Sequence, residues 1–215
     1  MEKEQYLTEL SRMLNKSGIK TAPFLNGELP VLLDGECVCR AGSGGDLYHR
    51  EGDLYSAQAL DVYDRAENAA KLVREYMTAM EQAPPLHAVS LDEQYKLLAD
   101  FGGYVLAGQE TTHGMKFITW SWDYDRTGVT IGHYFYDDYQ AAKEDFAVRS
   151  GLVQKEALFT PEQLTAVYAC IEDVVSLDST LTYEQEKTLE KVQEKISALF
   201  PNMQEQTPQT QQQTM

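Results

Sequence analysis

The clearest alternation of apolar and polar positions lies in residues 115–136, a stretch rich in β-branched and aromatic side chains. Such a composition is typical of β-strands. The sequence Asp-Arg-Thr-Gly at residues 125–128 divides this stretch with turn-forming residues. Asp suits the first position of a type I turn and Gly suits the fourth, where φ is often positive. The pattern therefore predicts a β-hairpin whose loop closes at Gly128 with a glycine bulge.

The register of this hairpin decides which side chains share a face. Pairing Tyr124 with Val129 makes one face almost wholly apolar and leaves polar side chains such as Thr119 and Ser121 on the other. A bulge that shifts the register by one residue would exchange the two faces. The expected pairs are Trp122 with Ile131, Trp120 with His133 and Ile118 with Phe135.

Residues 1–83 are expected to form an N-terminal domain of a helix, β-hairpins and a long helix. Amphipathic spacing over residues 3–16 indicates the first helix. Asp34-Gly35, flanked by apolar residues, indicates two strands joined by a turn. Helical spacing of apolar side chains over residues 58–82 indicates the long helix, and Pro84-Pro85 ends it and marks a domain boundary.

Residues 84–200 are expected to form a second domain. Ser90-Leu-Asp-Glu93 is a capping-box sequence, and it predicts a helix that carries Tyr95 and ends at Gly102-Gly103. Residues 104–108 predict a strand that joins the hairpin in a three-stranded meander. Three more helices are predicted from capping signals, one over residues 138–150 behind Asp137 or Asp138, one from Thr160-Pro161, and one from Thr182 to Leu199.

These elements predict an α+β protein. Small antiparallel sheets, a hairpin and a meander, pack with helices, and the chain ends in a C-terminal helical pair. Residues 201–215 are rich in Gln and Thr and poor in core-forming side chains, which predicts a disordered tail.

The charge balance narrows the choice of partners. The chain has 18 Lys plus Arg and 34 Asp plus Glu, a formal net charge of −16. Such a charge repels nucleic acid and anionic membranes, so direct non-specific nucleic-acid binding is not expected, and a protein partner with a basic surface is favoured. The sequence shows neither a signal-peptide pattern nor the run of ~18 apolar residues that a membrane span needs. We therefore expect a cytoplasmic protein without membrane association.

The three cysteines, Cys37, Cys39 and Cys170, are an odd number and give no disulfide framework. Cys37 and Cys39 with His49 form only part of a zinc-site pattern, because such sites use paired cysteines at wider spacing and four ligands. No metal or cofactor is predicted, and metal binding by Cys37 and Cys39 is left open.

Two other patterns suggest chemistry without completing it. Residues 42–45, Gly-Ser-Gly-Gly, resemble a phosphate-binding loop, but the Gly-Lys-Ser/Thr ending of a P-loop is missing. His133 forms a candidate acid–base pair with Asp123 or Asp125, but no Ser or Cys nucleophile lies in an elbow motif. The sequence therefore predicts no catalytic residue.

The residues expected to bind a partner gather around the hairpin. Aromatic side chains dominate contact energies at protein interfaces, and carboxylates suit a basic partner. The alternation favours a core role for Trp120 and Trp122. The predicted partner-binding residues are Trp120, Trp122, Tyr134, Asp125, Arg126, Asp137 and Asp138.

Three stretches resemble a module of accessory proteins from conjugative elements, plasmids and phages of gut Gram-positive bacteria. These stretches are residues 95–108, 117–135 and 141–152, and the resemblance covers roughly residues 84–200. The group has no defining catalytic motif, so the resemblance assigns no functional residue. It implies a cytoplasmic protein of a mobile genetic element, and small acidic proteins of such elements often oppose host defence.

The expected function is that of a non-enzymatic acidic binding protein. Charge and resemblance together favour an anti-defence inhibitor, anti-CRISPR- or antirestriction-like, which binds a nucleic-acid enzyme such as a host defence nuclease. A structural or regulatory accessory of element transfer is the first alternative. A small enzyme that uses the Gly42–Gly45 loop is the second.

Overall fold

The structure is a computed structural model that describes residues 3–89, 91–155, 158–177 and 180–199. The chain forms two compact units, Met1–Val153 and Gln154–Met215. The elements of the first unit are α1 (Lys3–Lys16), β1 (Lys20–Thr21), β2 (Glu28–Leu33), β3 (Glu36–Gly42), β4 (Leu47–Tyr48), α2 (Ala57–Gln82), β5 (Lys96–Phe101), β6 (Tyr104–Thr111), β7 (Gly114–Trp122), β8 (Val129–Tyr136) and α3 (Tyr139–Arg149). Those of the second unit are α4 (Pro161–Leu177) and α5 (Tyr183–Leu199).

The fold is α+β, as the sequence predicts. Two antiparallel sheets each follow chain order, β1-β2-β3-β4 and β5-β6-β7-β8. Asp34 and Gly35 both have positive φ in the tight turn that joins β2 to β3, as a type I′ hairpin turn requires. The expected strands around this turn are therefore confirmed.

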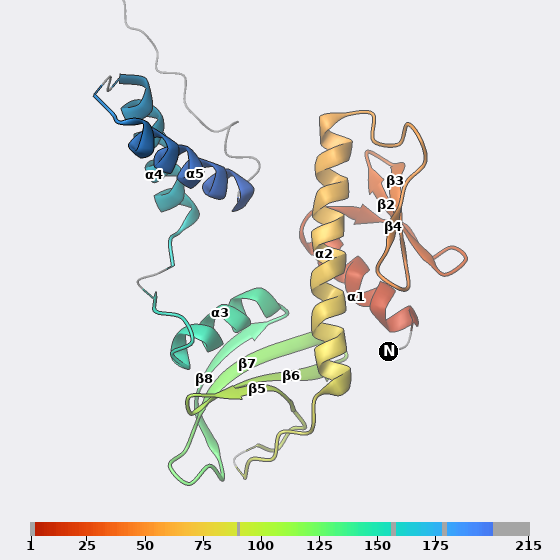
Figure 1. Cartoon of the computed structure of the whole chain (residues 1–215). Coiled ribbons are helices and arrows are strands. Elements are labelled where there is room, and N and C mark those ends of the chain that lie inside the picture. The colour runs from red at the N-terminus through yellow and green to blue at the C-terminus, as the bar shows by residue number, and fades with distance from the viewer. Residues whose placement is uncertain (1–2, 90, 156–157, 178–179, 200–215) are drawn as a thin grey trace, which may run out of the picture. The chain divides into compact units, whose positions relative to one another are not determined.

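Helix α2 connects the two sheets and packs against strands of both (Figure 1). Ser56 caps its start by accepting a hydrogen bond from the Ala59 backbone N–H at 3.0 Å. Its apolar stripe packs against β2 and β3 near one end and against β5 near the other. Pro84 and Pro85 follow the last turn and prevent its continuation.

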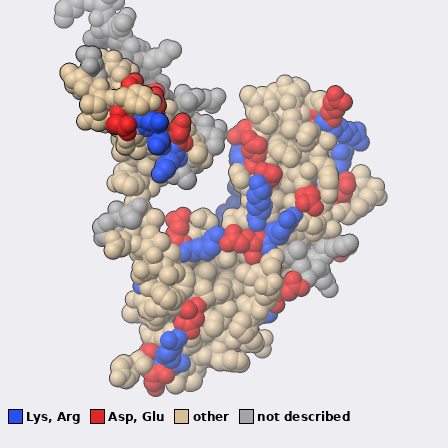
Figure 2. Space-filling view, viewed as in Figure 1, with Lys and Arg blue, Asp and Glu red and all other residues tan. Residues whose placement is uncertain are grey.

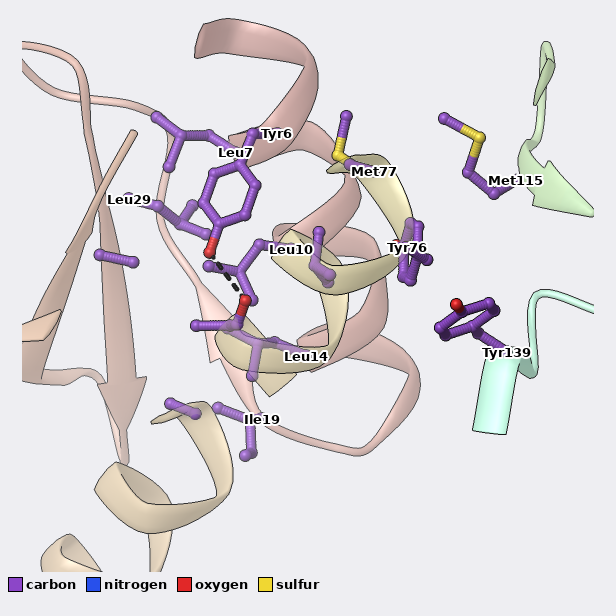
Figure 3. Packing of buried hydrophobic residues seen from close by; sticks show 14 of the residues in the cluster. Tyr6, Leu7, Leu10, Leu14, Ile19, Leu29, Tyr76, Met77, Met115 and Tyr139 are labelled. Carbon is purple, nitrogen blue, oxygen red and sulfur yellow. Dashed lines mark hydrogen bonds between the residues drawn. The ribbon is translucent and has the colours of Figure 1, made fainter. Parts of the chain in front are cut away.

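The main core lies where α1 packs on α2 and on the first sheet (Figure 3). Leu7, Leu10 and Leu14 recur on one face of α1 at helical spacing, and all three are buried. The Tyr6 hydroxyl donates to the Ala70 backbone carbonyl at 3.1 Å, which satisfies a buried polar group. The same core continues without a break into side chains of β6, β7 and α3.

The second sheet is covered on both faces. Phe117 faces α2 and α3, where its ring packs against Tyr139 with the centroids 4.8 Å apart. Its neighbour Ile118 points to the opposite face, as alternation requires, and joins a smaller core with Trp120 and Leu86. Residues 84–89 and Leu91 cover this opposite face.

The prediction of a helix that carries Tyr95 and ends at Gly102-Gly103 is wrong, because residues 96–101 form strand β5. This strand pairs with β6 through a register shift between Leu97 and Ala99. The shift breaks the period-two alternation that identifies a strand, and it leaves a sequence whose spacing imitates a helix. Gly102 and Gly103 therefore form a tight β-turn rather than a helix end.

The hairpin of β7 and β8 is confirmed, but its predicted register is wrong. Trp122 pairs with Val129, and Thr119 pairs with His133. Two irregularities in this ladder shift the register along β8, so the expected partners of Trp120 and Ile118 are displaced. The turn also differs from prediction, because the positive φ, 59°, is at Arg126 rather than at Gly128.

The C-terminal helical pair is confirmed as α4 and α5. Thr160 and Gln163 form a reciprocal capping box, in which each backbone N–H donates to the other side chain, at 2.8 Å and 3.2 Å. Thr182 and Gln185 repeat this arrangement at the start of α5. The capping signals in the sequence therefore place both helix starts correctly.

The boundary expected at residue 84 falls inside the first unit, where one core joins side chains from both sides of it. The expected disordered tail, residues 201–215, lies outside the described residues.

Candidate functional site

A cleft of about 1380 Å³ opens at the C-terminal end of α2. The last turns of α2, residues 85–89 and 91–95, and the ends of β5, β6 and β7 form its walls, and Gln5 of α1 also lines it. This volume is large enough for several side chains of a partner, since small-molecule pockets typically have about 300–1,000 Å³. We call it the methionine cleft, after the three side chains described next.

Met77 and Met80 on α2 and Met115 on β7 lie at the apolar part of the lining, which also contains Pro85, Leu86, Ala88, Val89 and Leu91. Each of the three is largely buried from solvent. Gly108 on β6 lies under the Met80 sulfur, and a Cβ at this position would collide with it. Unbranched thioether side chains adapt their shape to different partners, which is why methionine is frequent at versatile binding surfaces.

The segment 84–89 forms one wall because it pairs along the start of β5. The Leu86 N–H donates to the Tyr95 carbonyl at 2.7 Å, and the Leu97 N–H donates to the Pro84 carbonyl at 2.9 Å. Farther along, the Val89 N–H donates to the Thr127 carbonyl in the β7–β8 turn at 2.9 Å. This wall is therefore fixed to the sheet at both of its ends.

The polar lining of the cleft is acidic. Its described residues include the four carboxylates Glu81, Asp92, Glu93 and Glu110, and one ammonium group, that of Lys96. The Lys96 ammonium donates to the Ala83 carbonyl at 3.2 Å, which holds it against the end of α2. Carboxylates therefore set the sign of the local field, and a cation is favoured in the cleft.

Glu93 is the best-positioned of these carboxylates. Gln109 and the Tyr95 hydroxyl each donate to its Oε2 at 2.9 Å, and these hydrogen bonds lower the pKa of Glu93. Burial, and then the Glu93 carboxylate, raise the pKa of Tyr95 in turn. The Tyr95 ring also meets Trp120 edge-on, with centroids 5.0 Å apart. The carboxylate is thus held charged and in place at neutral pH.

The predicted aromatic residues behave differently from one another. Trp120 is only 5 % exposed and belongs to the core below the segment 84–89, in agreement with the alternation. Trp122 is half-buried, and the Arg126 guanidinium lies 5.4 Å from the centroid of its ring. Tyr134 is 55 % exposed on the outer strand of the sheet. Of the three, Tyr134 offers the largest accessible surface to a partner.

The predicted charged residues are already engaged within the chain. Arg126 forms an ion pair with Asp100 at 2.5 Å, and Asp125 accepts a hydrogen bond from the Thr127 hydroxyl at 2.9 Å. Asp137 pairs with Lys16 at 2.6 Å, while Asp138 caps α3. The structure does not place these residues in the lining of the methionine cleft. Thr127, which follows Asp125 and Arg126 in the β7–β8 turn, does line it. Their partner-binding role stays a prediction.

His133 pairs with Asp145 of α3 rather than with Asp123 or Asp125. The His133 Nδ1 lies 2.9 Å from Asp145 Oδ1, and the buried Thr119 hydroxyl donates to the same carboxylate. Arg149 donates to the Thr119 hydroxyl at 2.8 Å and to the Ile131 carbonyl at 2.7 Å. These bonds secure the irregular outer strand to α3, and the Thr119 hydroxyl donates to the Asp145 carboxylate rather than to His133.

The Gly42–Gly45 loop uses its own backbone groups internally. The Gly42 N–H donates to the Asp46 carbonyl and the Gly45 N–H donates to the Gly42 carbonyl, both at 2.9 Å. Arg74 of α2 donates to the Gly44 carbonyl. Two of the loop's four backbone N–H groups, those of Gly42 and Gly45, are therefore already paired and cannot also bind a phosphate.

Among the described residues, no three His, Cys, Asp or Glu side chains converge as a metal site requires. The Cys37 thiol contacts the Cys39 carbonyl at 3.4 Å. Burial, and then the neighbouring Cys37, raise the pKa of Cys39 to about 12, which leaves its thiol protonated and unreactive at neutral pH. The His49 ring packs edge-on against Tyr63.

The acidic side chains do not form one broad patch on the face shown in Figure 2, where Lys and Arg side chains lie beside Asp and Glu. Ion pairs such as Lys143 with Glu75 and Lys71 with Glu67, both at 2.7 Å, account for part of this mixing. Because many cations are paired within the chain, the surplus carboxylates determine how it interacts with a charged partner.

Comparison with known protein families, curated proteins and solved structures gives no match. No described helix is long and apolar enough to cross a membrane. The residues that line the methionine cleft were not predicted as a site, because they are distributed over residues 5–127 and only the fold brings them together.

Proposed function

We propose that this is a non-enzymatic acidic binding protein whose methionine cleft receives an apolar, positively charged segment of a protein partner. One observation carries the proposal: a large cleft combines three adaptable methionines with four carboxylates and a single ammonium group. Apolar lining favours burial of aliphatic or aromatic side chains, and the carboxylates favour Lys or Arg beside them. An amphipathic helix with basic flanks has this chemistry.

The net charge of −16 and the resemblance to accessory proteins of mobile elements support a more specific role. Nucleic-acid enzymes have basic surfaces because they bind phosphates, and an acidic protein competes for those surfaces. We propose that the partner is a host defence nuclease in the cytoplasm, and that binding inhibits it in an anti-CRISPR- or antirestriction-like way.

The cleft is tested first with a peptide probe. A fluorescently labelled amphipathic helix of Leu and Lys should bind the full chain, and the anisotropy should rise with protein concentration. A peptide with Ser in place of Leu keeps the charge, and one with Glu in place of Lys keeps the apolar face. Both should bind at least ten-fold more weakly, and equal binding by either would contradict the proposed chemistry.

Matched variants locate the binding. Asp92→Lys with Glu110→Lys changes the net charge from −16 to −12, since each replacement adds two charge units. Glu51→Lys with Asp64→Lys makes the same change at exposed positions of the first unit that do not line the cleft. We expect roughly ten-fold weaker peptide binding from the cleft pair and less than a three-fold change from the control pair, because screened distant charges contribute little. Equal losses would show that charge, and not the cleft, determines binding.

The identity of the partner needs a separate measurement. A purified guide-RNA-programmed nuclease and a restriction endonuclease are each tested for direct binding without DNA, at low and at high salt. Binding that weakens steeply as salt rises is expected from charge attraction. If neither enzyme binds at low salt, the inhibitor proposal is wrong, and an accessory role in element transfer takes its place.

A further inference from the structure

Glu93 is held in place by neutral hydrogen-bond donors and not by a cation of this chain. The Gln109 side-chain amide and the Tyr95 hydroxyl both donate to its Oε2, and among the described residues none forms an ion pair with this carboxylate. Other ordered carboxylates are held by cations, as Asp100 is by Arg126. Glu93 therefore has a fixed position and a negative charge that no ion pair within the described chain neutralises.

Lys116 of β7 is the cation whose charge acts on Glu93. The two hydrogen bonds to Oε2 are the main cause of the lowered pKa of Glu93, and the charge of Lys116 adds a smaller contribution. The Lys116 ammonium lies 5.7 Å from the centroid of the Tyr134 ring and is not paired with the carboxylate. Because no described group hydrogen-bonds the Oε1 of Glu93, this oxygen can accept from a ligand.

The two donors belong to the rigid sheet. Tyr95 directly precedes β5, and Gln109 lies on the adjacent strand β6. The Tyr95 side chain is buried, and its ring packs edge-on against Trp120 with the centroids 5.0 Å apart. A group that is already ordered loses less entropy on binding than one that must be immobilised. Glu93 is therefore better prepared to bind a cation than a mobile surface carboxylate is.

A cation that enters the methionine cleft meets Glu93 and apolar side chains together. A lysine ammonium is compact and strongly hydrated, so it loses much hydration beside apolar surface. An arginine guanidinium is more weakly hydrated, and its flat faces can lie on apolar groups while its N–H groups donate in the plane. Its five N–H donors can also serve several carboxylates at once, and the cleft has four. The combined lining therefore favours arginine over lysine.

We propose that Glu93 makes the methionine cleft selective for an arginine of the partner segment. The inference rests on the proposed function and names the residue that the cleft prefers. The guanidinium donates to Oε1 of Glu93, and the aliphatic stem of the arginine lies against the apolar lining. Gln109 and Tyr95 act as positioning residues, because they orient the carboxylate and leave Oε1 for the partner.

Two peptides of equal charge test the selectivity. A labelled amphipathic helix of Leu and Arg should bind the full chain about five-fold more tightly than the helix of Leu and Lys, as measured by fluorescence anisotropy. Single Arg replacements at each Lys position in turn should place most of this gain at one position. Equal binding of the two peptides would overturn the inference and leave the proposed function standing. Binding of neither peptide would overturn both.

Matched variants of the chain test the role of Glu93. Glu93→Gln should weaken binding of the Leu–Arg peptide about ten-fold and remove the preference for Arg, because a charge-assisted contact is lost. Asp92→Asn removes the same charge from the neighbouring exposed carboxylate of the cleft, which no described side chain holds. It should weaken binding by less than about three-fold and keep the preference. Equal effects of the two variants would overturn the assignment of Glu93.

A change in the peptide gives a test that needs no altered fold. Citrulline has nearly the shape of arginine but no charge, and it replaces the one Arg that the scan selects. The replacement should weaken binding to the parent chain about ten-fold and to Glu93→Gln only about two-fold, because the two groups form one contact. Circular dichroism confirms that Glu93→Gln remains folded. Equal losses with both chains would show that the arginine does not meet Glu93, and would overturn the proposal.

Discussion

Gly102 and Gly103 stand side by side in the β5–β6 turn, but they are constrained in different ways. Both have positive φ, 58° and 83°. A Cβ on Gly102 would collide with the Ser150 backbone carbonyl at the end of α3, whereas a Cβ on Gly103 would meet nothing within 4 Å. Gly102 therefore allows the turn to touch α3, and Gly103 supplies only backbone freedom.

We predict that Gly102→Ala lowers the free energy of unfolding by about 2–4 kcal/mol, because strain and a collision with backbone add together. Gly103→Ala should lower it by only about 1 kcal/mol, since strain acts alone. Denaturant titration of both variants measures the difference. Equal midpoints would contradict the close approach of the turn to α3.

Positive φ at Arg126 shows why the turn was mispredicted from sequence. Glycine adopts this conformation most easily, so the sequence pointed to Gly128. The structure instead holds Arg126 at 59°, and its side chain pairs with Asp100 and lies over Trp122. Those partners come from other parts of the sheet, and local sequence contains no sign of them.

Among the elements, α3 shows which of two adjacent aspartates begins a helix. Asp138 accepts from the Ala141 N–H at 2.9 Å, whereas Asp137 forms an exposed ion pair with Lys16. We predict that Asp138→Ala lowers the free energy of unfolding by about 1 kcal/mol, the usual effect of losing a cap. Asp137→Ala should lower it by no more than about 0.5 kcal/mol. Thermal melting of the two variants compares them, and the reverse order would reassign the cap.

Prediction of the elements from sequence succeeded where the determinant is local. The capping boxes at Thr160 and Thr182 and the turn at Asp34-Gly35 each lie within a few residues, and the structure confirms them. The prediction failed for strand β5, because this strand is identified by its pairing with β6 across a register shift. Pairing is a tertiary property, so periodicity alone could not reveal it.

The methionine cleft could not be predicted for a related reason. Met77 and Met80 are close in sequence and suggest a buried helix face, but Met115 comes from a separate strand. Two of the acidic residues around them, Asp92 and Glu93, belong to a segment predicted as helix, where they resembled part of a capping box. Only the correct strand assignment brings Glu93 beside Tyr95 and Gln109.

At the scale of the whole molecule, buried tyrosines make stability depend on alkaline pH. Burial raises the pKa of Tyr6 and of Tyr139 from 10.0 to about 12, and it also raises the pKa of Tyr76. Between pH 10 and 12 the unfolded chain loses these protons while the folded chain keeps them. The stability is therefore complete below pH 10 and falls as pH rises, by up to about 1.4 kcal/mol per pH unit for each group.

This dependence is measured by denaturant titration at several pH values from 8 upward, with unfolding followed by circular dichroism. Tyr6→Phe should lose about 1 kcal/mol at neutral pH, because its hydrogen bond to the Ala70 carbonyl is removed. Above pH 10 its stability should fall less steeply than that of the parent chain. An unchanged slope would show that Tyr6 does not contribute to the alkaline loss.

The chain order of the two sheets has a consequence for how the protein forms. Each strand pairs only with strands adjacent to it in sequence, so the loops that must close are short. Proteins with such local contacts fold quickly. The strands β1 to β4 are complete before α2 has been synthesised, and β5 to β8 follow as a second local group. Each sheet can therefore begin to assemble on the ribosome in turn, and α2, made between them, joins the two when its apolar stripe docks.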